Sequence, residues 1–178
     1  MRTTADIATA DIVMGRTRTH VLLPSPIGPL TLVAEAGQVT GLYMDSQRHR
    51  PESETLGVAG DPADEPFASA ARQLAAYFAG DLTTFDLPLA PAGTPFQQRV
   101  WSALQTIPYG QTWSYAELAS RVGSASRAVG LANGRNRISL IIPCHRVIGS
   151  DGSLTGYGGG LDRKRYLLEL EASDGRGR

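Results

Sequence analysis

Cysteine is nearly absent from this sequence. Cys144 is the single cysteine among 178 residues, so the chain can form neither an internal disulfide nor a Cys-rich zinc site. This excludes a disulfide-stapled secreted fold and a zinc finger, and it favours a reducing compartment. A chain of this length is expected to bury a sizeable core, as one domain or two small ones, without covalent staples.

Long hydrophobic runs are also missing. No stretch approaches the roughly 18 consecutive apolar residues that a membrane-spanning helix needs. The first 20 residues carry Asp6 and Asp11 and have no apolar segment of a signal peptide. We therefore expect a cytoplasmic protein that is neither exported nor inserted in a membrane.

Lysine is scarce as well, because Lys164 is the only one and the other basic residues are Arg. The net charge of zero is divided unevenly along the chain. Residues 1–91 carry six basic and eleven acidic residues, whereas residues 92–178 carry eleven basic and six acidic ones. Arg binds phosphate bidentately and stacks on bases, so the C-terminal half suits a polyanion. The alternative is a solvated basic surface with no nucleic-acid partner, in which a coding preference for Arg explains the scarcity of Lys.

The N-terminal half has the pattern of a small sheet followed by a helix. Short β-branched runs bounded by turn residues predict strands at residues 19–23, 30–34 and 39–44. Residues 45–65 mix Pro, Gly, Ser and charges, and are predicted to form a long loop. Apolar residues at helical spacing predict a helix over residues 66–79, which Gly80 ends.

Three helix signals follow in the basic half. Thr94 with Gln97, and Ser114 with Glu117, are capping boxes that open the first two helices, and Gly123 ends the second. A third short helix is predicted over residues 126–132, before Asn133-Gly134. The last two helices, joined by a tight turn, are typical of a helix-turn-helix. Two antiparallel core helices have the same pattern.

The residues that carry chemistry come directly after an apolar run, residues 138–142. Pro143 ends the run, and Cys144, His145 and Arg146 follow at once. A thiol reacts as its thiolate, so Cys144 needs a proton acceptor or a cation nearby, and His145 and Arg146 are candidates. Neighbouring side chains on extended backbone point to opposite sides, so a Cys-His couple requires a tight turn after Pro143 or a bridging water.

The imidazole also needs a carboxylate that orients it. Glu169 and Glu171, at the end of a last helix predicted over residues 161–170, are the nearest in sequence. A buried Cys144 that acts only as a small hydrophobe is the alternative.

Four glycines surround one aromatic residue at residues 156–160. This segment is neither a Walker loop nor a dinucleotide-binding fingerprint, so no nucleotide cofactor is predicted. A flat ligand such as a base could stack on Tyr157 and bond to bare backbone N–H groups. A plain flexible loop is the alternative.

Together these residues resemble the O6-alkylguanine-DNA alkyltransferases, also called methylated-DNA:protein-cysteine methyltransferases. Residues 143–147, Pro-Cys-His-Arg-Val, match the signature of that family. Further matches occur in order at residues 94–101, 107–110, 114–115, 127–130, 136, 156–160 and 167–171. Residues 19–91 resemble the smaller N-terminal domain of the family more loosely, through residues 25–30 and 77–80.

The resemblance implies a stoichiometric reaction in which a flipped alkylguanine, or O4-alkylthymine, enters a pocket. The cysteine takes the alkyl group irreversibly, so the protein is consumed. On the matching positions, Cys144 is the acceptor, His145 deprotonates it through a water, and Glu171 holds the imidazole. The resemblance also implies supporting residues: Asn136 braces the site, Tyr115 gives a proton to the leaving guanine, and Tyr157, Gly158 and the carbonyl of Val147 line the base pocket.

The resemblance further implies that the third helix lies in the minor groove of DNA. Arg127 takes the place of the extruded base in the stack. Small side chains allow close approach of such a helix. The implied DNA-binding residues are Ser126, Arg127, Ala128, Gly130 and Asn133. Flipping costs a few kcal/mol, and least for a damaged base, so lesion preference can arise before any pocket contact.

The sequence departs from the family pattern at two points. Arg137 follows Asn136 where many members have Pro, which changes the local loop. Some members bind zinc in the N-terminal domain through Cys and His, but only His20 and His49 occur there. We predict no structural zinc and no other cofactor. Relatives that bind lesions without repairing them replace the cysteine, whereas Cys144 is present.

We predict an α+β fold in two parts. A small N-terminal sheet-plus-helix domain, ribonuclease-H-like, spans residues 19–91, and a mostly helical DNA-binding and active-site domain spans residues 92–173. Residues 1–18 form an extension and residues 174–178 a tail. The expected partner is double-stranded DNA bearing O6-alkylguanine, bound by a monomer that can cluster on DNA.

Two other functions remain compatible with the residues. A non-catalytic lesion-binding module would bind alkylated DNA without a covalent mark. A cysteine hydrolase using Cys144, His145 and Glu171 would turn over repeatedly on a small ester or amide. The hydrolase leaves Arg127 and the basic helices without a role.

Overall fold

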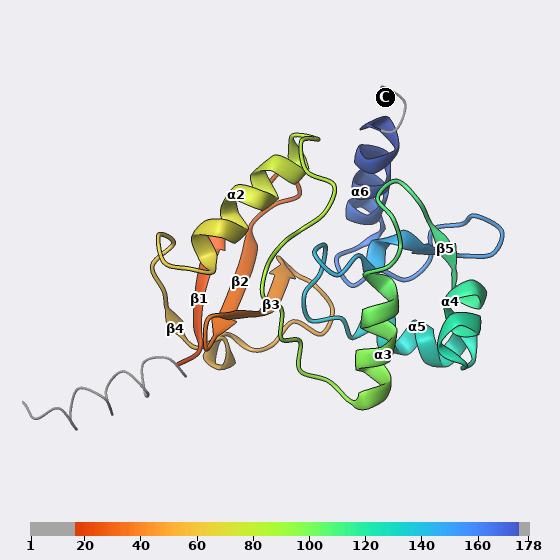
Figure 1. Cartoon of the computed structure of the whole chain (residues 1–178), viewed down its shortest axis with the longest axis horizontal. Coiled ribbons are helices and arrows are strands. Elements are labelled where there is room, and N and C mark those ends of the chain that lie inside the picture. Colours follow the sequence, from red (N-terminus) through yellow and green to blue (C-terminus); the bar gives the residue numbers. More distant parts are fainter. Residues whose placement is uncertain (1–16, 175–178) are drawn as a thin grey trace, which may run out of the picture.

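A four-stranded sheet with one helix on it lies beside a cluster of helices (Figure 1). The computed structural model describes residues 17–174, so the predicted N-terminal extension and C-terminal tail fall almost entirely outside the described residues. The α+β prediction is confirmed. Within the described residues, no helix is long and apolar enough to cross a membrane.

The sheet consists of the three predicted strands and one short addition. Its order is β3-β2-β1-β4, with antiparallel pairs except for β4, which runs parallel to β1. The strands are β1 (Thr19–Leu23), β2 (Leu30–Glu35), β3 (Gln38–Met44) and β4 (Val58–Ala59). The predicted loop at residues 45–65 contains β4 and a 3₁₀ turn, η1 (Ser53–Thr55). Two residues are too few for an alternation pattern, so only pairing with β1 reveals β4.

One face of the sheet packs against α2 (Phe67–Phe78). Val21, Leu32 and Leu42 lie opposite one another on β1, β2 and β3 and are buried. The helix buries Phe67, Ala70, Leu74 and Tyr77. It ends before Gly80, whose φ of 81° is the left-handed conformation that glycine adopts without strain.

Three helices form the other part: α3 (Pro95–Leu104), α4 (Tyr115–Val122) and α5 (Ser126–Gly134). Both predicted capping boxes are formed, at Thr94 and at Ser114. Gly123, with φ 67°, ends α4 and turns the chain into α5, which gives the predicted helix-turn-helix. The α5 helix runs two residues further than predicted, through Asn133 and Gly134, because the Asn133 side chain bonds inward instead of ending the helix.

The apolar run at residues 138–142 joins the two parts. The amide of Leu42 on β3 donates to the Arg137 carbonyl at 2.8 Å, and the amide of Ser139 donates to the Leu42 carbonyl at 3.1 Å. The chain then forms a 3₁₀ turn, η2 (Cys144–Arg146), and β6 (Val147–Ile148), which pairs with β5 (Trp113–Ser114). The last helix, α6 (Leu161–Asp174), is longer than predicted.

Trp101 connects α3 to α5 inside the core. Its side chain is 1% exposed, and its indole Nε1 donates to the Ala132 carbonyl at 2.9 Å. Trp101→Phe should lower the free energy of unfolding by about 2–3 kcal/mol, because it unpairs a buried carbonyl and leaves a cavity. Trp113→Phe, at a half-buried site, should cost less than about 1 kcal/mol. Urea unfolding followed by circular dichroism measures the free energy of unfolding of both variants. Equal losses would contradict the role of Trp101 in joining α3 to α5.

Candidate active site

Cys144 opens the 3₁₀ turn directly after Pro143, which is the tight turn that the sequence required. Its side chain is buried. Burial raises the pKa of the Cys144 thiol, although a hydrogen bond from Asn136 and the charge of Lys164 act in the opposite direction. The thiol is therefore protonated at rest and needs a base before it can react.

His145 is the group that can act as this base. It is fully buried, and its Nε2 lies 2.8 Å from Oε1 of Glu171 on α6. Burial lowers the pKa of His145, against the raising effect of Glu171, so the ring is neutral at neutral pH. Since Nε2 donates to the carboxylate, Nδ1 carries the free lone pair. Nδ1 is buried and has no hydrogen-bond partner among the described residues.

Glu171 is the carboxylate that orients the imidazole, whereas Glu169 is exposed. Oε1 of Glu171 also accepts from Tyr77 Oη at 2.7 Å and from Arg146 Nη2 at 2.9 Å, and Oε2 accepts from Arg146 Nε at 2.9 Å. Burial favours the neutral acid, but His145 and Arg146 outweigh it and bring the pKa of Glu171 down to about 2. Glu171 is therefore ionised at physiological pH.

Arg146 is not the cation that serves the thiol. Its guanidinium binds Glu171, donates through Nη1 to the Ile107 carbonyl at 2.7 Å, and lies 5.7 Å from the centre of the Tyr109 ring. Arg146 was predicted to be a cation near the thiol because it is close to Cys144 along the chain. In the 3₁₀ turn its side chain instead extends toward Glu171 and Ile107, and becomes the counter-charge of a buried carboxylate.

Lys164 is the cation that the sequence analysis missed. It is fully buried on α6, and its Nζ donates to the carbonyls of Val147 at 2.5 Å and Thr155 at 3.0 Å. Burial lowers the pKa of Lys164 to about 8, so the ammonium form still prevails at neutral pH. Its charge stabilises a Cys144 thiolate. The available signal was that this one Lys occurs in a chain whose other basic residues are all Arg.

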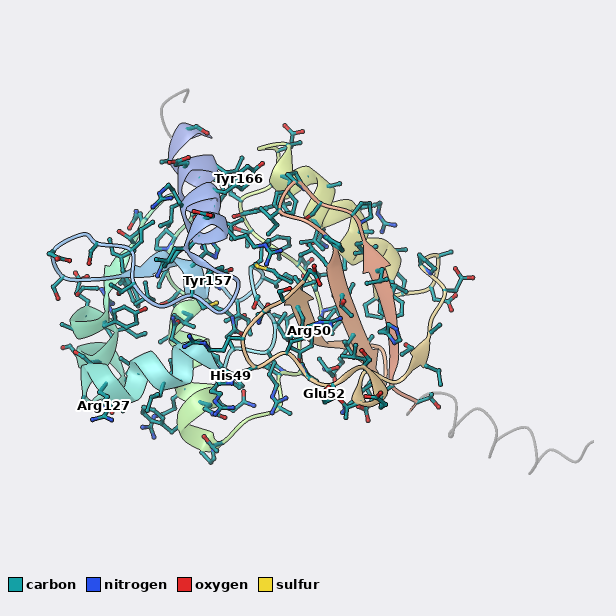
Figure 2. All side chains as sticks on the ribbon, turned by 180° about the vertical axis from the view of Figure 1, so that it is seen from behind. His49, Arg50, Glu52, Arg127, Tyr157 and Tyr166 are labelled. Carbon is teal, nitrogen blue, oxygen red and sulfur yellow. The ribbon has the colours of Figure 1, made fainter. Side chains whose placement is uncertain are left out.

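Two of the predicted site residues, Tyr115 and Val147, are connected to the loop at residues 155–160. Tyr115, at the start of α4, has its hydroxyl 3.0 Å from the Thr155 carbonyl and 3.4 Å from that of Gly156. The Tyr157 hydroxyl is buried and has no hydrogen-bond partner among the described residues. Figure 2 shows Tyr157 near the middle of the molecule, below α6. The Val147 carbonyl holds Lys164, and its second lone pair can accept another donor.

Close packing explains why glycine occurs at some positions of the loop at residues 156–160. A Cβ on Gly159 would lie 2.4 Å from Met44 Sδ of β3. The Gly158 carbonyl accepts from the Arg48 amide at 2.8 Å. The close backbone approach that the sequence suggested therefore includes contact with the sheet-bearing part of the protein.

The predicted DNA-binding residues differ in their exposure. Ser126 and Arg127 are exposed at the start of α5, and Arg127 points outward at the edge of the molecule (Figure 2). Ala128 and Gly130 are half-buried, and a Cβ on Gly130 would lie 3.8 Å from the Tyr115 ring. Leu131, which was not predicted as a contact, is 67% exposed on the same helix.

Asn133 is buried, unlike the other predicted DNA-binding residues of α5. It is 4% exposed, its Nδ2 lies 3.3 Å from the Cys144 carbonyl, and its Oδ1 is buried without a partner among the described residues. Its side chain thus faces the cysteine and not the outer surface of α5, because the helix continues through this position.

Asn136 ties down the segment that leads to the cysteine. Its Nδ2 donates to the Ile142 carbonyl at 2.8 Å, and its Oδ1 accepts from the Ile138 amide at 3.0 Å. The neighbouring Arg137 is exposed and donates to the Ala92 carbonyl at 2.7 Å. In the part of the chain that the structure describes, no group of three or more His, Cys, Asp or Glu side chains could hold a metal ion.

Comparisons with known proteins identify the family to which the chain belongs. Residues 95–173 match the family described as 6-O-methylguanine DNA methyltransferase, DNA binding domain, and residues 19–91 match its ribonuclease-like domain. The chain is 57% identical over 153 residues to the methylated-DNA–protein-cysteine methyltransferase of Mycobacterium tuberculosis, covering 85% of this chain and 90% of that protein. It is 51% identical over 157 residues to the methyltransferase of the same name from Methanosarcina acetivorans, covering 86% and 98%.

Solved structures give the same picture. The crystal structure of Mycobacterium tuberculosis O6-methylguanine methyltransferase superposes with a TM-score of 0.80 at 55% identity, covering 88% of this chain and 94% of that one. The crystal structure of Mycobacterium tuberculosis OGT in complex with DNA superposes with a TM-score of 0.78 at 54% identity, covering 88% and 93%.

The buried ionic network makes a prediction about stability. Glu171→Gln should lower the free energy of unfolding at pH 7 by about 3 kcal/mol, because it leaves the buried Arg146 without a counter-charge. The folded-state pKa of Glu171, about 2, lies below the ordinary value of 4.5. This stability is therefore present above pH 4.5 and is lost as the pH falls toward 2.

Urea unfolding of both proteins between pH 7 and pH 2 measures this effect. The gap between them should narrow as the pH falls, while Glu169→Gln, at an exposed position of the same helix, should behave as the wild type does. A gap that is independent of pH would contradict the role of the charge.

Proposed function

Because this chain belongs to the 6-O-methylguanine DNA methyltransferase family, we propose that it repairs DNA by moving the alkyl group from O6 of an alkylguanine to the sulfur of its own Cys144. The observation that carries this proposal is the buried thiol of Cys144 next to a neutral His145 that an ionised Glu171 holds. O4-alkylthymine is the second substrate that we expect.

The reaction that we propose starts with a proton transfer. His145 Nδ1 takes the Cys144 proton through a bridging water, and Glu171 stabilises the imidazolium. The thiolate attacks the alkyl carbon, a C–S bond forms and the C–O bond breaks. The leaving guanine takes a proton from the Tyr115 hydroxyl, and the proton held by His145 returns to the Tyr115 phenolate through water, so that both residues end neutral. The product is a thioether, which offers no leaving group to a second reaction, so each molecule acts once.

The charge of Lys164 stabilises a Cys144 thiolate once it forms, although the resting thiol is protonated. Burial alone disfavours any charge at Cys144, and the Lys164 ammonium opposes this effect. Lys164 donates to the carbonyls of both Val147 and Thr155, and we propose that it orders the base pocket in this way. We propose that Val147, Tyr157 and Gly158 hold the flipped base, and that Asn136 and Asn133 fix the backbone of the cysteine turn.

The exposed side of α5 is the DNA-binding surface in this proposal. Ser126, Arg127, Ala128 and Gly130 lie at its N-terminal end, and the small side chains of Ser126, Ala128 and Gly130 let the helix enter the minor groove. Arg127 fills the space of the flipped base. We place the boundary of the two domains at residue 91, and we expect a cytoplasmic monomer on double-stranded DNA.

Alkyl transfer predicts a covalent change that is confined to one residue. After mixing with a duplex that carries one O6-methylguanine, the intact mass should rise by one CH₂ group, on the peptide with Cys144, and saturate at one per molecule. Cys144→Ser should still bind the duplex and gain nothing. An unchanged mass, with the lesion intact and the protein folded and reduced, would support the lesion-binding module. Repeated turnover on a small ester would support the hydrolase.

Arg127 predicts a difference between duplex and single-stranded substrates. Arg127→Ala should slow alkyl transfer from duplex DNA by about 10- to 100-fold, because an extruded base costs a few kcal/mol when nothing replaces it. Transfer from a single strand should change much less. Arg165→Ala, an equal loss of charge at an exposed position of α6, is the control. Equal losses on both substrates would contradict the role in the stack.

A further inference from the structure

A tyrosine of the sheet-bearing part reaches into the active site. Tyr77 lies on α2, 94 residues before Glu171, and its side chain is fully buried. Its hydroxyl donates to Oε1 of Glu171 at 2.7 Å, the shortest of the hydrogen bonds to this carboxylate. The N-terminal part thus supplies one of the donors around the group that orients the base.

We propose that Tyr77 is a positioning residue for alkyl transfer, whose hydroxyl draws negative charge from Glu171 and so keeps His145 neutral. The proposal rests on the proposed function for its catalytic consequence. The effect of Tyr77 on the protonation of His145 involves only side chains of this chain and needs no substrate.

Tyr77 can affect His145 because three donors share one oxygen of Glu171. Oε1 of Glu171 accepts from Tyr77 Oη, from His145 Nε2 and from Arg146 Nη2, all within 2.7–2.9 Å. Each donor withdraws charge from that oxygen and weakens its pull on the imidazole proton. If the Tyr77 donor is removed, Oε1 binds an imidazolium more strongly. His145 then becomes harder to keep neutral.

Tyr77 cannot lose its proton or turn away. Burial and the nearby Glu171 raise the pKa of its hydroxyl far above the ordinary value, so it remains a donor. Its ring meets Tyr109 edge-on, with centroids 6.1 Å apart, and lies 5.4 Å from the ring of Phe85. With the side chain fully buried, water has no access to replace this hydrogen bond.

The ionisable groups around His145 come from three elements and the loop before α6. Arg146 lies on its own turn, and Glu171 and Lys164 lie on α6. Tyr77 from α2 donates to Glu171, and the charge of Glu171 raises the pKa of both Tyr77 and Tyr157 of the glycine-rich loop. Arg146 and Lys164 already disfavour the imidazolium by direct repulsion. Tyr77 is neutral, and it disfavours the imidazolium form of His145 through its hydrogen bond to Glu171.

Tyr77→Phe tests the proposal, because it removes one oxygen and keeps the ring. The chain has three histidines, so a pH titration of ¹⁵N-labelled histidine by NMR resolves His145 without DNA. We expect the pKa of His145 to rise by about half to one unit. The acidic limb of the transfer rate should move up by the same amount, so the rate there falls about 3- to 10-fold and recovers at higher pH. Affinity for the duplex should not change.

The matched control is Tyr166→Phe, the same change at an exposed position of α6 (Figure 2). It should leave the His145 titration and the pH profile unaltered. If Tyr77 served only to pack the core, its variant would have a lower melting temperature, an unchanged pKa of His145 and a rate reduced equally at all pH values. That result would overturn the proposal.

A second variant covers the case in which Tyr77→Phe does not fold. 3-Fluorotyrosine at position 77 keeps the shape and makes the hydroxyl a stronger donor, so the pKa of His145 should fall; an unchanged pKa overturns the proposal. Because the titration uses no substrate, a wild-type protein that shows no alkyl transfer would refute the proposed function while still reporting on Tyr77.

Discussion

The carboxylate of Glu171 accepts hydrogen bonds from the imidazole of His145, the guanidinium of Arg146 and the hydroxyl of Tyr77. A buried charge is costly unless hydrogen-bond donors surround it. Here Glu171 is buried away from solvent, and its donors come from α2 and from the turn that carries the cysteine. The two parts of the protein and the last helix must therefore be assembled before His145 has its orientation. The active site is a product of tertiary packing more than of any one segment.

Electrostatics of the thiol follow from the same burial. A solvent-exposed cysteine would ionise more easily, but it would also react with other alkylating agents and oxidants. In this structure burial raises the pKa of the Cys144 thiol, and the charge of Lys164 opposes this effect. Burial also lowers the pKa of His145, so a neutral imidazole and a buried ammonium group accompany the thiol in the folded protein.

Contacts between the two parts also hold the glycine-rich loop in place. Arg163 of α6 donates to the carbonyls of Ile27 at 2.9 Å, Asp45 at 2.6 Å and Gly159 at 3.2 Å. It therefore links the sheet-bearing part to the glycine-rich loop. Together with the bond between Arg48 and Gly158, it fixes the loop that carries Tyr157. The N-terminal part thus supports the loop that was predicted to line a base pocket, although no residue of that part was predicted to belong to the site.

The amino-acid sequence by itself determined the local elements and the identity of the nucleophile. Strands β1 to β3, the capping boxes at Thr94 and Ser114, and the stop at Gly123 depend on neighbouring residues, so they could be predicted from spacing. The Pro-Cys-His-Arg run, with the family motifs, indicated Cys144, His145 and a distant glutamate. Only the tertiary structure decided which groups surround them. Arg146 turned to Glu171, Lys164 and Tyr77 came in from distant helices, and Asn133 faced the cysteine, because burial and long-range hydrogen bonds leave no periodic trace in sequence.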